Sequence, residues 1–481
     1  MQEIPNGTMQ TTIPGVIACG MDIHKDKIDA CVRIGDGSAE GNVIIKTFST
    51  MRKTLFELRD WLISLDCYKV LMESTGVFWM PIYWILEEVS GMNVGVGNAR
   101  DLKNAPGRPK TDKEDAKWLS RLCMFGLVLK SFVVAKPFQA LREYTRYHKK
   151  LVQERARQIN RIERLLQMNG FKLSSVLSDI IGASGKRILK KLADVGELSV
   201  HDIQQLLDKR CEHTPEEVES AINGVMKNTS SLLLKMQLKK IDACDKEIDE
   251  VYEQMLCLSK DYTGAIRIIE SIPGMSIKSA IYIIAEIGTE LSSFRTANHL
   301  AAWAGLAPKE NESAGKARPS KTKKASQYVK SLMIQCAWAA IKTRDCRPSL
   351  WYWRNVKRLG DKKAITAVAR KLLCYIYAML KSGELYDKSL DVAYANDIRA
   401  EKLEAAQKIV GSRKKAKPSF EQSMNSIDIL DAPALEDFHE DIEIAHQQSE
   451  SVDQLISGIE SPGTTNTLKK RGRPQKAIVP S

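Results

Sequence analysis

The sequence of 481 residues lacks any apolar run of the roughly 18 residues that a membrane-spanning helix needs. Residues 1–14 are polar and do not have the charged and then apolar build of a secretory signal. With 43% hydrophobic and 27% charged residues, the composition is that of an ordinary soluble chain, long enough for two or three domains. We therefore expect a protein that stays in the cytoplasm and has no membrane partner.

Clusters of cysteine and histidine with the spacing of metal ligands are also missing. The ten cysteines are scattered without a Cys-x-x-Cys pair, and the seven histidines form no group with zinc spacing. This pattern argues against a zinc site and indicates buried, reduced thiols in a reducing compartment.

Positive charge, in contrast, is in excess. Lys and Arg number 72 against 59 Asp and Glu, which gives a formal net charge of +13. A surplus of this size indicates a polyanionic partner, usually nucleic acid, although a merely basic soluble protein has the same balance. Charge alone leaves both alternatives open.

Residues 16–125 alternate between strand and helix patterns. The predicted order is three strands, a helix, a strand, a helix, a strand and a helix, with limits 16–23, 28–34, 43–48, 55–65, 69–72, 79–89, 93–96 and 111–125. This βββαβαβα order is that of the ribonuclease-H-like α/β domain, which we predict for residues 1–135.

The rest of the chain is predicted to form three further segments. Residues 136–262 contain two stretches with apolar side chains every three or four residues, which predict long amphipathic helices, a coiled-coil linker and a dimerisation region. Residues 263–395 predict a compact, mainly α-helical domain. Residues 396–481 are polar and poor in aromatics, and their charges are grouped in basic and acidic runs, which predicts a disordered tail.

Four carboxylates can converge in the N-terminal domain. Asp22 ends the first predicted strand and Glu73 the fourth, and these strands are neighbours in a sheet of this order. Asp112 and Asp115 lie on one face at the start of a helix, where anionic side chains are favoured. Four such groups could hold two Mg²⁺ ions roughly 4 Å apart, which would activate the attacking and the leaving oxygen. The alternative is that each carboxylate is a turn or helix-cap residue.

A second candidate site is the polar loop at 309–316, which contains Ser313. Six cations crowd this loop and the residues after it: Lys309, Lys316, Arg318, Lys321, Lys323 and Lys324. Their density suits a phosphodiester backbone, and they would stabilise the charge that develops when a serine attacks phosphorus. From the residues alone, an ordinary serine in a solvated basic loop explains the pattern better.

Two short motifs also indicate contact with phosphates. The segment 271–276, Ser-Ile-Pro-Gly-Met-Ser, is similar to the loop of a helix-hairpin-helix, where backbone N–H groups face a phosphate, or it is a turn between two core helices. Arg471 and Arg473, within Arg-Gly-Arg-Pro, resemble an AT-hook that lies in a narrow minor groove. The alternative is a basic tail with loose affinity for polyanions.

Several of these segments resemble one family, the insertion-sequence-110 transposases, over roughly residues 16–390. The segments are Gly20-Met21-Asp22-Ile23-His24-Lys25, Met72-Glu73-Ser74-Thr75-Gly76, Lys110-Thr111-Asp112-Lys113-Glu114-Asp115-Ala116, Gly305-Leu306-Ala307-Pro308 and Ser313-Ala314-Gly315-Lys316. The resemblance implies a RuvC-like DEDD recombinase whose tetrad is Asp22, Glu73, Asp112 and Asp115. It also implies a C-terminal domain with a serine nucleophile at the position of Ser313. Family members often have Gly where this chain has Ala314, and Ser320 and Ser326 are the fallback candidates.

The resemblance further implies a mechanism and partners. The carboxylates would bind Mg²⁺ and position a DNA phosphate, and Ser313 would form a covalent phosphoserine link that the hydroxyl of another strand reverses. A homo-oligomer, dimer or tetramer, with a site composed of two subunits is expected. In several members a structured noncoding RNA bridges target and donor DNA, so a bridge-type guide RNA and a prokaryotic, nucleoid-associated location are expected too.

Two other functions stay open at this point. In the first, the carboxylates hydrolyse DNA directly with water, as a RuvC-like junction resolvase does, and Ser313 is incidental. In the second, the basic surface, the coiled coil and the AT-hook-like tail make a non-catalytic architectural DNA-binding protein. Ser313→Ala separates the recombinase from the hydrolase, and Mg²⁺-dependent cleavage separates both from the architectural protein.

Overall fold

The computed structural model describes residues 16–35, 42–74, 76–98, 102, 112–128, 130–308, 312–313, 316–317, 322 and 326–415. The chain divides into two compact units, Met1–Val133 and Val134–Ser481. None of the helices in the described ranges combines the length and the apolar character that crossing a bilayer requires.

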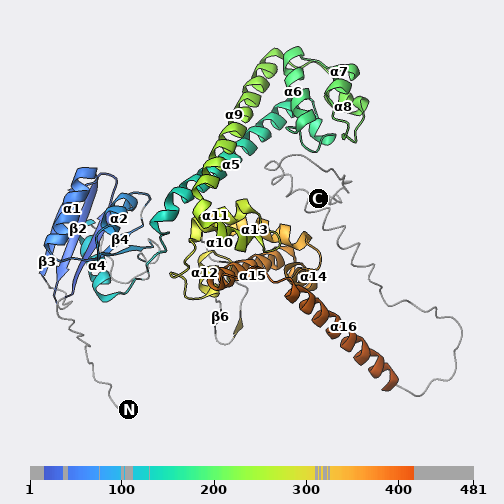
Figure 1. Ribbon diagram of the computed structural model, residues 1–481. Coiled ribbons are helices and arrows are strands. Elements are labelled where there is room, and N and C mark those ends of the chain that lie inside the picture. Colours follow the sequence, from blue (N-terminus) through green and yellow to red (C-terminus); the bar gives the residue numbers. More distant parts are fainter. Residues whose placement is uncertain are drawn as a thin grey trace, which may run out of the picture. The chain divides into compact units, whose positions relative to one another are not determined.

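The first unit is built on a five-stranded sheet (Figure 1). Its strands are β1 (Ile17–Ile23), β2 (Lys27–Ile34), β3 (Asn42–Ser49), β4 (Lys69–Glu73) and β5 (Asn93–Gly97), in the order β3-β2-β1-β4-β5. β2 runs antiparallel to β1 and β3, whereas β4 is parallel to β1 and β5 is parallel to β4. The predicted mixed α/β domain is confirmed, and its strand order agrees with a RuvC-like fold.

Helices cover both faces of this sheet because the side chains of each strand alternate between two apolar surfaces. On one face, Met21, Ile28 and Met72 pack with α1 (Arg52–Ser64) and α2 (Trp79–Glu87). On the other face, Ala18 and Leu71 pack with Leu119 and Leu122 of α4 (Asp112–Phe125). The alternation places Asp22 and Glu73 on the α4 face, because each lies an even number of residues from Ala18 or Leu71.

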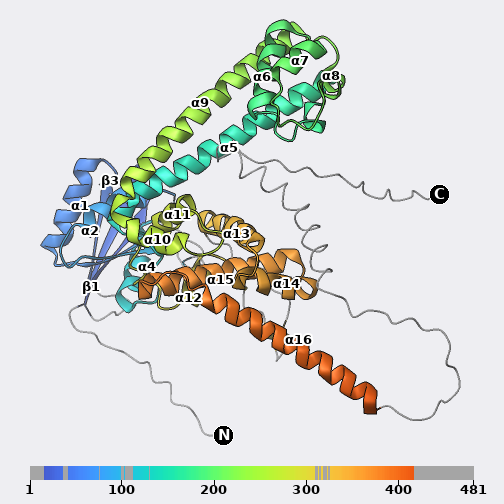
Figure 2. The ribbon, with the colours of Figure 1, turned by 45° about the vertical axis from the view of Figure 1, so that its right-hand side comes forward.

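The second unit begins with a helical hairpin. After η1 (Lys136–Phe138), the helices α5 (Gln139–Met168) and α9 (Asn228–Leu258) run antiparallel and side by side in both views (Figures 1 and 2). Between them lie η2 (Leu173–Ser175), α6 (Ala183–Val195), α7 (Val200–Leu206) and α8 (Pro215–Ile222).

One apolar cluster holds the far end of this hairpin together. It includes Ile162 and Leu166 of α5, Leu192 of α6 and Leu234 and Ile241 of α9, all of which are buried. The long amphipathic helices expected from the sequence are therefore present, and they pack on each other within one chain. A coiled coil between subunits stays a prediction.

The rest of the second unit is mainly helical, as the sequence indicates. After η3 (Lys260–Tyr262) come α10 (Thr263–Glu270), α11 (Ile277–Ile287), α12 (Ala297–Trp303), α13 (Gln327–Lys342), α14 (Arg347–Leu359), α15 (Asp361–Ser382) and α16 (Ser389–Lys415). α15 is the central helix, in contact with α10, α12, α13 and α14.

The segment 271–276 is a turn between two packed helices. Gly274 has φ +80°, and a Cβ there would lie 2.4 Å from the backbone nitrogen of Ala340 on α13. Ser276 caps α11 through a capping box with Ser279. These contacts match the core-turn alternative for this segment.

Two regions differ from the expectation. Residues 396–415, assigned to the disordered tail, continue α16, because stretches such as Arg399-Ala400-Glu401-Lys402-Leu403-Glu404 consist of strong helix formers. The polar segment that begins at residue 309 contains two short strands, β6 (Glu312–Ser313) and β7 (Lys316–Ala317), which pair antiparallel. The rest of the tail, residues 416–481, lies outside the described residues.

Candidate metal centre

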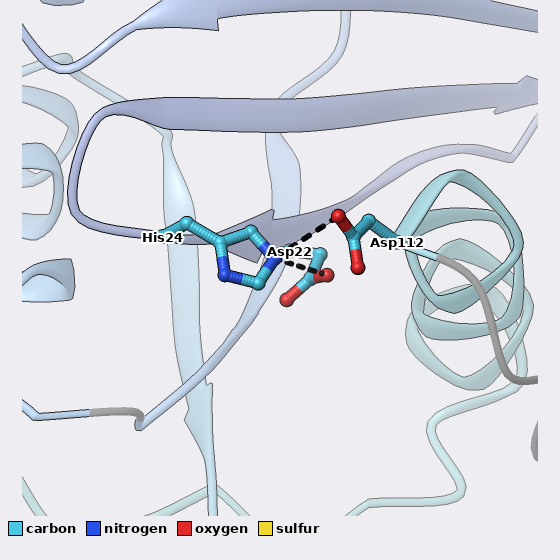
Figure 3. Close-up of side chains that lie close together, drawn as sticks. All are labelled: Asp22, His24 and Asp112. Carbon is cyan, nitrogen blue, oxygen red and sulfur yellow. Dashed lines mark hydrogen bonds and ion pairs between the residues drawn. The ribbon is translucent and has the colours of Figure 1, made fainter.

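The end of β1 and the start of α4 bring two carboxylates of the predicted tetrad together. Asp22 is 9% exposed, and Asp112 is the first residue of α4. The ring of His24 faces both of them, with Nε2 at 3.2 Å from Asp22 Oδ2 and 3.5 Å from Asp112 Oδ2 (Figure 3). One ligand atom from each of the three residues lies within 4.8 Å of the other two.

Glu73 and Asp115 belong to the same neighbourhood. β1 and β4 are parallel with Met21 opposite Met72, so that Asp22 and Glu73, the next residue of each strand, lie at the same edge of the sheet. Glu73 is 6% exposed. Asp115 lies about one turn along α4 from Asp112, and its charge acts on Asp22. Neither belongs to the tight group of Asp22, His24 and Asp112.

Besides His24, three polar residues that were not predicted from the sequence lie at the site: Asp29, Thr47 and Lys27. Asp29 is the direct cross-strand partner of Asp22 and is 1% exposed. It accepts hydrogen bonds from Thr47 Oγ1 at 2.6 Å and from Lys27 Nζ at 3.1 Å. Lys27 Nζ also donates to Asp112 Oδ2 at 2.7 Å.

The alternation of side chains along β2 could have indicated that Lys27 and Asp29 belong to the site. Cys31 and Arg33, two and four residues after Asp29, contact Ser120 of α4. The odd-numbered positions of β2 therefore face α4, as Asp22 does, and the pattern Lys-x-Asp-x-Cys-x-Arg could have placed Lys27 and Asp29 there.

The pKa values of the site reflect burial and charge pairing. Burial raises the pKa of Asp22; the nearby His24 lowers it, and the charges of Asp112 and Asp115 raise it. A hydrogen bond from Lys27 lowers the pKa of Asp112, and the same bond raises the pKa of the Lys27 ammonium. The mutual repulsion of the carboxylates is the kind of electrostatic problem that a bound cation relieves.

The donor set fits a divalent cation. Carboxylate oxygens are the preferred ligands of hard cations such as Mg²⁺, which keeps several waters as further ligands. Asp22 and Asp112 come from different elements and present their oxygens to one point, with the buried Glu73 at the same sheet edge. Their chemistry is therefore suited to holding a divalent metal ion.

The structure describes only the backbone of the second candidate site. Ser313 lies opposite Lys316 in the β6–β7 pair. Lys309, Arg318, Ser320, Lys321, Lys323, Lys324, Arg471 and Arg473 lie outside the described residues. Ser326, a fallback nucleophile, is the residue before α13 and makes no side-chain cap.

Two family models match the chain in the order that the sequence motifs predict. Residues 19–169 match the DEDD transposase model of IS110, and residues 266–352 match the transposase model of the IS116/IS110/IS902 family. Both matches, together with the relatives below, support an IS110-family transposase. The first match contains the whole tetrad, and the second contains Ser313.

Curated relatives of this transposase family match the chain in part. The transposase for insertion sequence element IS1111A of Coxiella burnetii is 27% identical over 30% of this chain and 40% of that protein. The uncharacterized 42 kDa protein of insertion element IS900 of Mycobacterium paratuberculosis is 28% identical over 33% and 39%. The pilin gene-inverting protein of Moraxella bovis is 26% identical over 30% and 45%. The chain thus spans less than half the length of these relatives.

Proposed function

We propose that the chain is a DNA transposase that cuts and rejoins strands at a metal-dependent carboxylate site with a serine nucleophile. The observation that carries the proposal is the meeting of Asp22 and Asp112 around His24, inside the segment that matches the DEDD transposase model. Relatives named as a transposase and as a pilin gene-inverting protein favour strand exchange over simple cleavage.

Asp22, Glu73, Asp112 and Asp115 would hold the metal, for which we propose Mg²⁺. The bound cation would supply charge stabilisation for the oxygens of the reacting phosphate. Asp22, buried at the sheet edge, would provide a rigid ligand, whereas Asp112 is 44% exposed in its side chain and lies where DNA can reach it. Lys27, which neutralises Asp112, adds a cation to the same edge.

Ser313 would be the nucleophile that forms a covalent link to the DNA strand. Its hydroxyl oxygen bonds to phosphorus while the phosphorus–oxygen bond to the neighbouring nucleotide breaks, and the leaving oxygen takes up a proton as a free hydroxyl. The hydroxyl of another strand then attacks the phosphoserine, which restores the serine and joins the DNA. Because each step exchanges one phosphodiester for another, no ATP is needed.

We assign contact with the DNA backbone to the six cations of residues 309–324. Lys309, Lys316, Arg318, Lys321, Lys323 and Lys324 would bind phosphates, and the charge of +13 is consistent with that role. Arg471 and Arg473 would add a minor-groove contact of the AT-hook type.

The partners of the reaction follow from the family. We propose a homo-oligomer, dimer or tetramer, a bridge-type guide RNA, and action on the nucleoid in a prokaryotic cytoplasm. An exposed apolar stripe on α9 supports self-association: Leu232, Leu233 and Met236 are 60%, 47% and 56% exposed and share one face of the helix.

The test is to trap a protein–DNA adduct that survives denaturation. Full-length protein is incubated with Mg²⁺, DNA carrying the ends of its element and any co-expressed flanking RNA, and the adduct is mapped by mass spectrometry. We expect wild-type adduct on Ser313, none with Ser313→Ala, and none with Asp22→Asn or Asp112→Asn. Ser326→Ala is the matched serine control and keeps the adduct.

Other outcomes would replace the proposal by one of its rivals. Mg²⁺-dependent cutting that persists in Ser313→Ala without an adduct identifies a RuvC-like hydrolase. DNA binding without any cutting, unchanged by Asp22→Asn, identifies an architectural protein. An adduct that maps to Ser326 moves the nucleophile and leaves the rest of the mechanism standing.

A further inference from the structure

His24 is the one nitrogen donor in the group that joins Asp22 and Asp112, among the residues that the structure describes. Its Nε2 faces an oxygen of each carboxylate, at 3.2 Å and 3.5 Å. We propose that His24 is a ligand of the metal centre and that its imidazole makes the site prefer Mn²⁺ to Mg²⁺. This inference rests on the proposed function, since it assumes that the carboxylates hold a metal.

The two separations between His24 Nε2 and the carboxylate oxygens are near those of neighbouring ligands on one ion. Two ligands at about 2.1 Å from a metal and at right angles to each other lie about 3 Å apart. The two separations from His24 Nε2 are close to this value. A hydrogen bond explains the contact of His24 with Asp22. It does not explain the contact with Asp112, because 3.5 Å is long for an N–H···O bond.

The turn after β1 holds His24 in place. The backbone N–H of His24 donates to the carbonyl of Lys27 at 2.9 Å, which closes the turn between β1 and β2. Thr50 Oγ1 donates to the carbonyl of Lys25 at 2.7 Å and ties the turn to the end of β3. The His24 side chain is 45% exposed, so that its ring can exchange a carboxylate contact for a metal without opening the core.

The choice of metal follows from ligand chemistry. Mg²⁺ binds oxygen ligands and water, whereas imidazole suits transition metals. A site made of carboxylates alone has little preference between Mg²⁺ and Mn²⁺. One neutral imidazole raises the affinity for Mn²⁺ relative to that for Mg²⁺. Coordination through Nε2 requires the tautomer with its proton on Nδ1.

The experiment measures metal binding on the full-length protein without DNA. Calorimetric titrations with MnCl₂ and with MgCl₂ are compared for wild type, His24→Gln, Asp22→Asn and His213→Gln. His213→Gln is the matched control, because His213 pairs with Glu217 at 2.8 Å on α8, in the other unit. Spin-echo spectroscopy of bound Mn²⁺ reports whether a nitrogen nucleus is coupled to the ion, and circular dichroism checks the fold of each variant.

We expect wild type to bind Mn²⁺ with nitrogen coupling that His24→Gln abolishes and His213→Gln preserves. Loss of the ligand is expected to weaken Mn²⁺ binding by roughly tenfold or more, since even outer residues of metal sites contribute about tenfold. Mg²⁺ affinity should change by less than about threefold, because Mg²⁺ replaces an imidazole with water at little loss.

The results separate this inference from the proposed function. Mn²⁺ binding that depends on Asp22 but shows no nitrogen coupling, with His24→Gln equal to wild type, overturns the assignment of His24 and leaves the carboxylate site intact. If neither wild type nor Asp22→Asn binds Mn²⁺ or Mg²⁺, the proposed metal centre itself is refuted. Nitrogen coupling that survives in His24→Gln transfers the role to another residue and also overturns the inference.

Discussion

Gly20 of β1 lies directly beneath the backbone of Ser120 of α4. A Cβ at position 20 would be 2.1 Å from the Ser120 nitrogen and 2.4 Å from the Ala116 carbonyl oxygen. The helix can therefore approach the strand only because residue 20 has no side chain. This close packing of α4 on β1 brings Asp112, at the start of α4, next to Asp22, two residues after Gly20.

Gly20→Ala is expected to destabilise the protein and to separate the two carboxylates. Backbone atoms cannot turn aside as side chains do, so the added methyl must push the helix away, and overpacking of this kind costs about 3 kcal/mol. Urea unfolding and MnCl₂ titration measure the two effects. Gly264→Ala in α10, where nothing lies within 4 Å, is the control and should change stability by about 1 kcal/mol or less. Equal stability of Gly20→Ala and wild type would contradict the packing.

Lys27→Gln is expected to strengthen metal binding. Lys27 Nζ occupies Asp112 Oδ2 at 2.7 Å and its charge repels an incoming cation. Removing one unit charge about 5 Å from a divalent ion should increase affinity about tenfold at low salt and less at high salt. Calorimetry at two salt concentrations measures this. Lys25→Gln removes the same charge from the same turn but keeps the Lys27–Asp112 pair, so a gain in that variant alone would refute the direct role of Lys27.

Glu286→Gln is expected to loosen the junction between α5 and α11. Glu286 is 2% exposed and accepts from Arg142 at 3.0 Å and from Arg146 at 2.7 Å. Its loss leaves two partly buried guanidinium groups without their carboxylate, which should cost about 3 kcal/mol in the free energy of unfolding. Guanidinium unfolding of the variant measures the change.

The control for Glu286 is an exposed pair on α9. Lys246 and Glu250 are 3.7 Å apart, with side chains 80% and 65% exposed, and Glu250→Gln should change stability by less than about 0.5 kcal/mol. If the two substitutions have equal effects, the buried cluster has no special role in stability.

His148 is expected to make the protein acid-sensitive. It is 1% exposed, its Nδ1 lies 2.7 Å from the Tyr282 hydroxyl, and burial, followed by the charge of Lys278, lowers its pKa to about 4. In the unfolded chain the pKa is about 6.5, so the unfolded state binds the proton first as the pH falls. The stability present above pH 6.5 should therefore decline between pH 6.5 and 4, by about 3 kcal/mol at most.

Thermal unfolding of His148→Gln across this pH range tests the assignment. The variant has no titrating imidazole, and its stability should fall less steeply between pH 6.5 and 4 than that of wild type. His201→Gln, whose ring is exposed on α7 and pairs with Gln205, should keep the wild-type slope. Parallel curves for wild type and His148→Gln would assign the acid sensitivity to other groups.

Local pattern alone determined much of this protein. The spacing of apolar residues predicted each strand of the sheet, α1, α2, α4 and the long helices α5 and α9, because alternation and helical periodicity are properties of neighbouring residues. The same local reading placed Asp22 and Glu73 at strand ends and Asp112 and Asp115 at a helix start. It also singled out the Ser313 segment, which it assigned to a loop and in which the structure has the strand pair β6–β7.

Only the tertiary structure decided which side chains share the site with Asp22. The antiparallel register sets Asp29 opposite Asp22, the turn folds His24 back toward two carboxylates, and Lys27 reaches α4 across 85 residues of sequence. Each of these contacts depends on strand register and on the closeness that Gly20 permits. Register and helix-to-sheet distance are set by packing between distant segments, and for that reason no window of neighbouring residues contains them.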